Sequence, residues 1–141
     1  MLDTMKIQKM VDQSYRRCRL AGTFADDFYR ELWNLSPEIA AYFRNTDMGT
    51  QMRALDSGVR YLILYFHDPN PITETMVHRL GEKHSGSHLN VPPKLYALWL
   101  DALMKTVESH DPQFSAELEE AWRTVMEHGI SVFESVYALE S

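Results

Sequence analysis

The chain has little cysteine, no long hydrophobic run and less positive than negative charge. Its 141 residues contain one cysteine, Cys18, which excludes an internal disulfide and indicates a reducing compartment. The longest apolar run, Tyr61 to Phe66, has the length of a core helix segment and is much shorter than a membrane span. The formal net charge of −6 disfavours nonspecific binding to nucleic acid or anionic lipid. Because no signal sequence is visible either, we expect a soluble, cytoplasmic protein with no nucleic-acid or membrane partner.

Motifs that cradle phosphate, activate a nucleophile or hold zinc between cysteines are also missing. Adjacent carboxylates such as Asp26-Asp27 and Glu119-Glu120 do not face each other on a helix, so we interpret them as solvated charges rather than an acid–base pair. Four histidines stand among polar residues or at predicted helix ends, and we expect them to be solvated too. These are His67, His78, His110 and His128.

What the chain does contain is apolar sequence with helical periodicity. Hydrophobic residues make up 45% of it, including 3 Trp, 7 Tyr, 6 Phe and 8 Met, enough for a core and for the walls of a large cavity. We predict one all-α domain over residues 1–141, with a buried or half-buried Cys18 and with Gly58 allowing another helix to approach closely. The expected helices cover about 4–20, 24–35, 36–43, 51–67, 72–86, 92–110 and 114–136, with a polar loop at 44–50.

His84 is the residue that points most directly to a function. It follows Leu80 by four residues and Val77 by seven, so the three side chains share one apolar helix face. A histidine that enters an apolar pocket from such a face is suited to be an axial haem ligand. Taken alone, the pattern is more typical of a core histidine whose ring is satisfied within the protein, and the rest of the sequence favours the haem interpretation.

A second interpretation pairs His84 with His88 as half of a zinc or nickel site. The two histidines are four residues apart and could face one metal from a helix. Gly86 between them weakens a continuous helix, and no acidic third ligand follows. The haem interpretation is therefore favoured over this one.

Three pairs of residues follow one another along the chain at separations that are characteristic of the globin family. With these pairs, and with Trp122 and Phe133 in the last helix, the chain resembles that family. The pairs are Pro37 with Phe43, Gln51 with Leu55, and Leu80 with His84. The resemblance is to single-domain bacterial globins and to the haem domain of flavohaemoglobins, and it covers the chain from about Val11 to Tyr137. It implies a globin-like fold of about seven helices around a pocket for haem b (iron protoporphyrin IX). Only eight residues separate Phe43 from Gln51, which implies a short or absent helix between them.

The resemblance also implies roles for individual residues. His84 matches the proximal iron ligand and is the only metal ligand implied, while Phe43 matches the phenylalanine that stacks on the haem face. Tyr29, Gln51 and Leu55 match residues on the distal side, where the gas binds. The full haem-contacting set is Tyr29, Phe43, Gln51, Leu55, Leu80, His84, Val91 and Tyr96.

Two departures from the flavohaemoglobin pattern concern the proximal side. Twelve residues separate His84 from Tyr96, about two more than expected, and His88 falls in this extended corner. Tyr96 matches the tyrosine that supports the proximal histidine, but the position of the supporting glutamate holds Tyr137. A charged partner that raises the basicity of His84 is therefore missing, with Glu134 one turn away.

The resemblance implies reversible binding of a diatomic gas (oxygen, nitric oxide or carbon monoxide) at the His84-ligated iron, with no residue assigned a catalytic role. Two alternatives stay open. One is a nitric oxide dioxygenase-type enzyme that receives electrons from a separate reductase, and the other is a haem-based gas sensor or interaction module. The oligomeric state also stays open, with a homodimer among the options.

Overall fold

A computed structural model describes residues 3–84 and 93–140, with side chains for residues 3–79 and 94–132. Seven α-helices and no strand are present in these ranges, which confirms the all-α prediction. The helices are Thr4–Cys18 (α1), Phe24–Leu35 (α2), Pro37–Ala41 (α3), Met48–His67 (α4), Pro71–His84 (α5), Tyr96–His110 (α6) and Ala116–Glu140 (α7). Two 3-10 turns, Arg19–Ala21 (η1) and Pro93–Leu95 (η2), precede α2 and α6.

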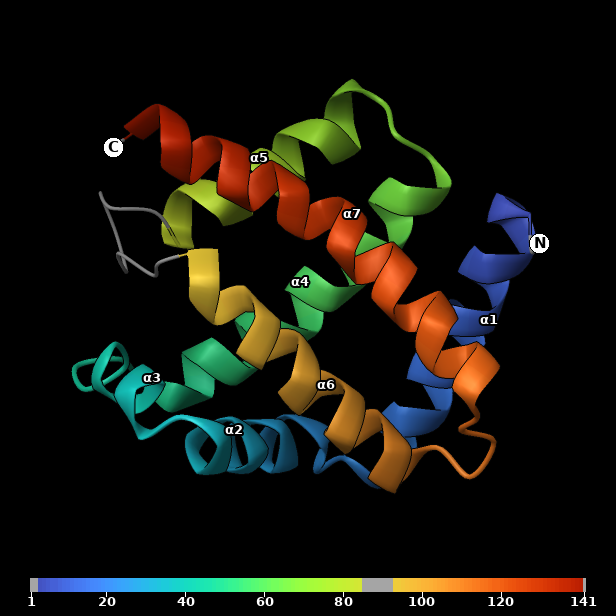
Figure 1. Ribbon diagram of the computed structural model, residues 1–141, viewed down its shortest axis with the longest axis horizontal. Coiled ribbons are helices and arrows are strands. Elements are labelled where there is room, and N and C mark those ends of the chain that lie inside the picture. The colour runs from blue at the N-terminus through green and yellow to red at the C-terminus, as the bar shows by residue number, and fades with distance from the viewer. Residues whose placement is uncertain (1–2, 85–92, 141) are drawn as a thin grey trace.

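The helices pack across one another rather than side by side in a parallel bundle. In Figure 1, α6 packs across α2 at an angle, and α7 crosses the molecule against α5, α4 and α1. Within the part of the chain that the structure describes, no helix is both long and apolar enough to cross a membrane.

The start of α4 differs from the prediction of a polar loop over residues 44–50. The helix begins at Met48, because the Asp47 carboxylate accepts hydrogen bonds from the Gly49 amide at 3.1 Å and the Thr50 hydroxyl at 3.0 Å. These bonds lower the pKa of Asp47, that from Thr50 most strongly. An aspartate that caps the first turn is a strong helix start. Gln51 consequently lies in the first turn of α4. No helix lies between α3 and α4, where the structure describes every residue, as expected from the short separation of Phe43 and Gln51.

Helices α4 and α7 approach each other closely at Gly129 of α7. A Cβ atom at this position would overlap the side chain of Leu62 on α4, so only glycine lets the helices come this near. Gly58, for which the sequence predicted such a role, lies on the wall of the cavity described below.

A buried polar network ties α1 to the corner between α6 and α7. The Ser14 hydroxyl donates to Asp111 at 2.5 Å and accepts from the Trp122 indole nitrogen at 2.9 Å. Arg17 forms two further bonds to the Asp111 carboxylate, at 2.7 and 2.9 Å. Burial alone would raise the pKa of Asp111, but the bonds from Arg17 and Ser14 outweigh it and lower the pKa. Cys18, predicted to be buried or half-buried, is fully buried on the same helix.

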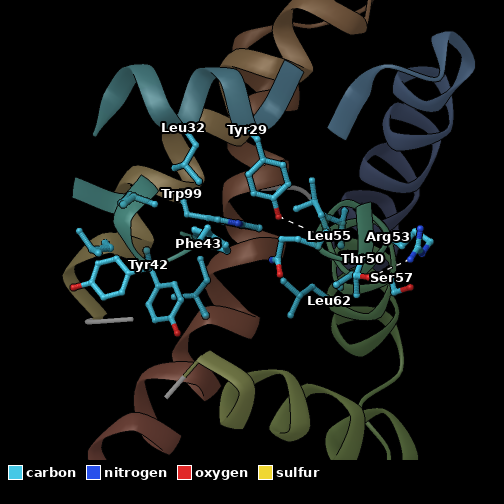
Figure 2. Close-up of a pocket in the computed structure, with 18 of the residues that line it drawn as sticks. Tyr29, Leu32, Tyr42, Phe43, Thr50, Arg53, Leu55, Ser57, Leu62 and Trp99 are labelled. Carbon is cyan, nitrogen blue, oxygen red and sulfur yellow. Dashed lines mark hydrogen bonds between the residues drawn. The ribbon is translucent and has the colours of Figure 1, made fainter. Parts of the chain in front are cut away.

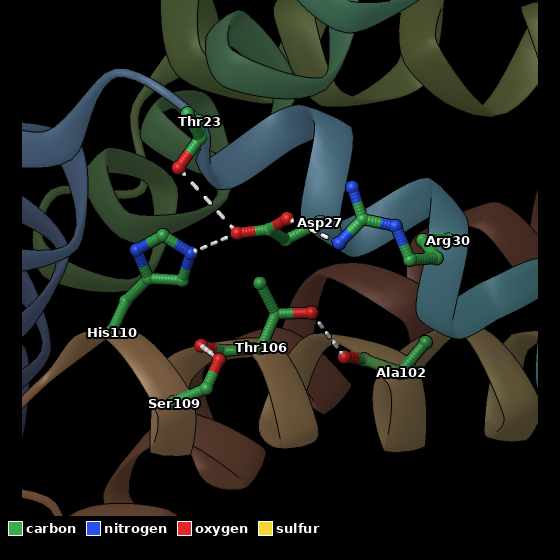
Figure 3. Close-up of polar contacts among 7 residues, drawn as sticks. All are labelled: Thr23, Asp27, Arg30, Ala102, Thr106, Ser109 and His110. Atoms are coloured by element: carbon green, nitrogen blue, oxygen red, sulfur yellow. Dashed lines mark hydrogen bonds and ion pairs between the residues drawn. The ribbon is translucent and has the colours of Figure 1, made fainter.

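The prediction that Asp27 and His110 are solvated is wrong. Nε2 of His110 lies 2.7 Å from an Asp27 oxygen, and Arg30 donates to the same carboxylate at 2.8 Å (Figure 3). The His110 side chain is only 10% exposed and its ring packs edge-on against Phe24. The hydrogen bond from His110 lowers the pKa of Asp27, and Arg30 adds to the effect. The physical reason is that α2 packs against the end of α6, a contact that polarity along a single helix does not reveal.

Candidate functional site

A cavity of about 450 Å³ lies between α2, α3, α4, α6 and α7. Its volume falls within the range of about 300–1,000 Å³ that is usual for small-molecule sites. Most of its wall is apolar or aromatic, and Figure 2 shows Leu32, Leu62 and Trp99 facing it from three different helices. The pocket therefore suits a large, mainly apolar ligand.

Five of the eight residues assigned by resemblance lie on the wall of this cavity. They are Tyr29, Phe43, Gln51, Leu55 and Tyr96. They come from α2, the turn after α3, the first two turns of α4, and the first residue of α6. Residues distant in the sequence are thus gathered around one space.

The side chains of the other three assigned residues are not among those that the structure describes. Leu80 and His84 belong to the last turn that the structure describes for α5, but their side chains lie outside the described residues. Val91 and His88 lie outside the described residues altogether, as do the side chains of Glu134, Tyr137 and Phe133. Helix α5 packs against α4 and α7, which both line the cavity, and in Figure 2 it runs on the side of the cavity opposite α2.

Tyr29 projects from α2 toward α4, with its hydroxyl at the cavity end of the ring (Figure 2). The side chain is buried, and the hydroxyl lies 3.5 Å from the backbone carbonyl oxygen of Gln51. Burial raises the pKa of Tyr29 to about 12, although the contact with Gln51 opposes the rise. The phenol is therefore protonated at neutral pH and able to donate, and its present hydrogen bond is long and weak.

Aromatic rings surround Tyr29 on several sides. Its ring centroid lies 4.9 Å from that of Phe28, 5.5 Å from Trp33 and 6.1 Å from Phe43. Phe28 is in turn packed edge-on against Trp99 of α6, at 5.7 Å. Trp33 follows Tyr29 by one turn on α2, and periodicity along one helix could not indicate that it meets Phe43.

A polar rim on α4 was also missed. Thr50, Arg53, Ser57 and Tyr61 line the cavity at intervals of three or four residues, and Arg53 donates to the Thr50 hydroxyl at 3.2 Å. Among the described residues that line the cavity, Arg53 carries the one charged side chain. The spacing on the helix could have revealed this stripe, since it runs beside Gln51 and Leu55 on the boundary between the buried and exposed faces.

The described part of the chain offers no alternative metal centre. No group of three or more histidine, cysteine, aspartate or glutamate side chains gathers there in a way that could hold an ion. Single-histidine ligation from α5 is a different arrangement, and it does not depend on such a cluster.

The crossed helices and the cavity between them have the architecture of a globin. A profile of the globin family matches residues 26–133, and the chain belongs to this family. It is similar to protein PA3967 from Pseudomonas aeruginosa PAO1, whose crystal structure is described as highly homologous in structure to a human haemoglobin. The two chains are 41% identical, the match covers 93% of this chain and 98% of the other, and the TM-score is 0.87. No protein with a curated description matches the chain. The predicted resemblance to bacterial single-domain globins is confirmed.

Proposed function

We propose that the cavity holds haem b with His84 as its iron ligand, and that the protein reversibly binds oxygen, nitric oxide or carbon monoxide there. The observation that carries this proposal is the convergence of Tyr29, Phe43, Gln51, Leu55 and Tyr96 on one cavity, with α5 running on the side opposite α2. The proposal treats the whole chain as one haem domain in the cytoplasm.

The walls of the cavity suit the chemistry of haem, which is a flat apolar ring with carboxylate groups at one edge. Phe43 and Leu55 provide apolar surface, whereas Arg53 provides a cation at the rim. The proximal side is supported by α5, on which Val77 is fully buried. His84 follows Val77 by seven residues, so the helical period brings it back to the same face.

Bound haem supplies an iron at which a diatomic gas can coordinate. The residues of the chain decide how firmly the gas is then held. A buried, protonated Tyr29 can leave its weak bond to the Gln51 carbonyl and donate instead to a partly negative atom of the ligand. The surrounding aromatic side chains exclude water, which strengthens that hydrogen bond.

Absorption spectra test the proposal directly. Purified protein titrated with haem should develop a Soret band at one haem per chain, and the ferrous form should change its spectrum on addition of carbon monoxide. A protein that gives no Soret band with excess haem would contradict both haem binding and gas binding.

The presence of both Tyr29 and Gln51 on the cavity wall favours one further candidate, a nitric oxide dioxygenase activity supported by a separate reductase. The measurement that separates the two functions is consumption of nitric oxide with oxygen, reductant and a reductase. Multiple turnovers would identify an enzyme, and a single turnover per haem would identify a gas-binding protein.

A further inference from the structure

Trp33 lies directly behind two residues of the cavity wall without lining the cavity itself. It follows Tyr29 by one turn on α2 and is half-buried, nearer to the surface than the buried Tyr29. Its ring centroid lies 5.5 Å from that of Tyr29, at an interplanar angle of 40°, and 5.5 Å from that of Phe43, at 51°. Because the rings of Tyr29 and Phe43 also meet, at 6.1 Å, the three form a closed triangle, here called the aromatic triad.

The aromatic triad matters because the Tyr29 hydroxyl is weakly held. Its hydrogen bond to the Gln51 carbonyl is 3.5 Å long, so packing around the ring does more than this bond to fix where the hydroxyl stands. Phe28, which is fully buried, supports the ring from one direction. Trp33 contacts it from another direction and at the same time contacts Phe43, which lies in the turn between α3 and α4.

We propose that Trp33 is a positioning residue for the gas ligand. It holds the Tyr29 ring so that the hydroxyl faces the cavity, and it ties that ring to Phe43 on the neighbouring wall. This inference rests on the proposed function. It implies that Trp33 controls the retention of a polar ligand such as oxygen and has much less influence on carbon monoxide, which carries little charge to accept a hydrogen bond.

The experiment compares three variants of the haem-loaded full chain. Trp33→Leu removes the ring and keeps an apolar side chain, and Trp33→Phe keeps a smaller ring. Phe66→Leu is the control, because it removes a half-buried ring that contacts His128 and does not line the cavity. Trp33→Leu should speed oxygen release by about three- to tenfold, which is smaller than the effect expected when the Tyr29 hydroxyl itself is removed. Trp33→Phe should restore most of the wild-type rate, and Phe66→Leu should leave it unchanged.

Two further measurements distinguish a positioning role of Trp33 from a general loosening of the fold. The carbon monoxide stretching frequency, which senses a nearby hydrogen-bond donor, should shift in Trp33→Leu, while the carbon monoxide release rate stays close to wild type. In a Tyr29→Phe background, Trp33→Leu should add nothing to the oxygen release rate, because the group that it positions is already gone.

Two results would overturn the inference: an unchanged oxygen release rate in Trp33→Leu, or effects of Trp33→Leu and Tyr29→Phe on that rate that are fully additive. The proposed function would not be affected by either result as long as the protein shows a Soret band. If Trp33→Leu does not fold, Trp33→Met, which also lacks the ring, carries the same comparison, and a wild-type oxygen release rate together with a wild-type carbon monoxide frequency in that variant would overturn the inference. A wild-type protein that binds no haem would overturn both proposals.

Discussion

Tyr29 combines a buried phenol with a loosely held hydroxyl, so its loss should be easy to measure. A hydrogen bond to a partly charged acceptor contributes about 1.5–3 kcal/mol, and each 1.4 kcal/mol is about tenfold in equilibrium. Tyr29→Phe should therefore speed oxygen release by about one to two decades, with little effect on carbon monoxide. Stopped-flow displacement of oxygen measures the rate. An unchanged rate would identify Tyr29 as a core aromatic that plays no part in ligand retention.

His84 is the residue on which iron binding is proposed to depend. His84→Gly should lose the five-coordinate ferrous spectrum, and added imidazole should restore it by occupying the space of the missing ring. Absorption spectra of the reduced protein with and without imidazole follow both steps. His88→Ala serves as the matched control, and loss of the spectrum in that variant alone would move the ligand assignment to His88.

How far single residues can be predicted from the sequence depends on where their partners lie. Tyr29, Gln51 and Leu55 were assigned by resemblance to the globin family, and all three line one cavity. His110 and Asp27 could not, because 83 residues separate them and each looks solvated within its own helix. Relations along one helix are visible in a sequence, whereas contacts between helices depend on how the helices cross.

At the scale of elements, the crossing of α4 and α7 depends on Gly129. Gly129→Val should lower the free energy of unfolding by about 1–3 kcal/mol, since the new side chain must displace Leu62 from a tightly packed position. Urea denaturation monitored by circular dichroism measures the change. Gly49→Val is the matched control, because a Cβ atom there meets only ordinary contacts, the nearest at 3.5 Å from an Asp47 oxygen.

The contact itself can be checked by combining substitutions. Leu62→Ala alone should cost about 2–5 kcal/mol through the space that it leaves. In that background Gly129→Val should destabilise much less than in the wild type, because the overlapping atoms are gone. Strict additivity of the two changes would show that Gly129 and Leu62 do not meet.

Helix boundaries were predictable where proline or glycine interrupts the periodicity. Helix α4 stops at His67 before Asp68-Pro69, and α5 begins at Pro71, as expected. The start of α4 was placed too late because Asp47 was interpreted as one of several loop residues and not as a cap. Ser36 shows the opposite case: the helix expected over about 36–43 begins at Pro37 directly after it, although the Ser36 side chain makes no capping hydrogen bond.

For the molecule as a whole, we expect two carboxylates with lowered pKa values, the buried Asp111 and the half-buried Asp27, to contribute more to the response to acid than Asp47, which is exposed. The pKa values of Asp111 and Asp27 are lower in the folded protein than the usual value of about 3.9 in an unfolded chain. Their contribution to stability is therefore fully present above that value and is lost as the pH falls through the folded-state pKa. The midpoint of thermal unfolding should fall steeply below about pH 4.

Asp111→Asn should lower the unfolding free energy at pH 7 by about 1–3 kcal/mol, because the buried hydrogen-bond partners lose a charged acceptor. It should also flatten the fall in stability between about pH 4 and pH 2. Thermal unfolding over a pH series measures both effects. An acid response as steep as that of the wild type would show that other carboxylates dominate.

The network of Ser14, Asp111 and Trp122 sets the smallest fragment that can fold. The family profile begins at residue 26, yet Ser14 on α1 provides the acceptor for the buried Trp122 indole and a donor for the buried Asp111. A fragment trimmed to residues 26–133 would keep Trp122 and Asp111 and lose both Ser14 and Arg17. It would leave the Trp122 indole nitrogen without its acceptor and would leave Asp111 with the backbone amide of Gln113 in place of three side-chain bonds, so we expect the cooperative folding unit to extend beyond the segment by which the family is recognised.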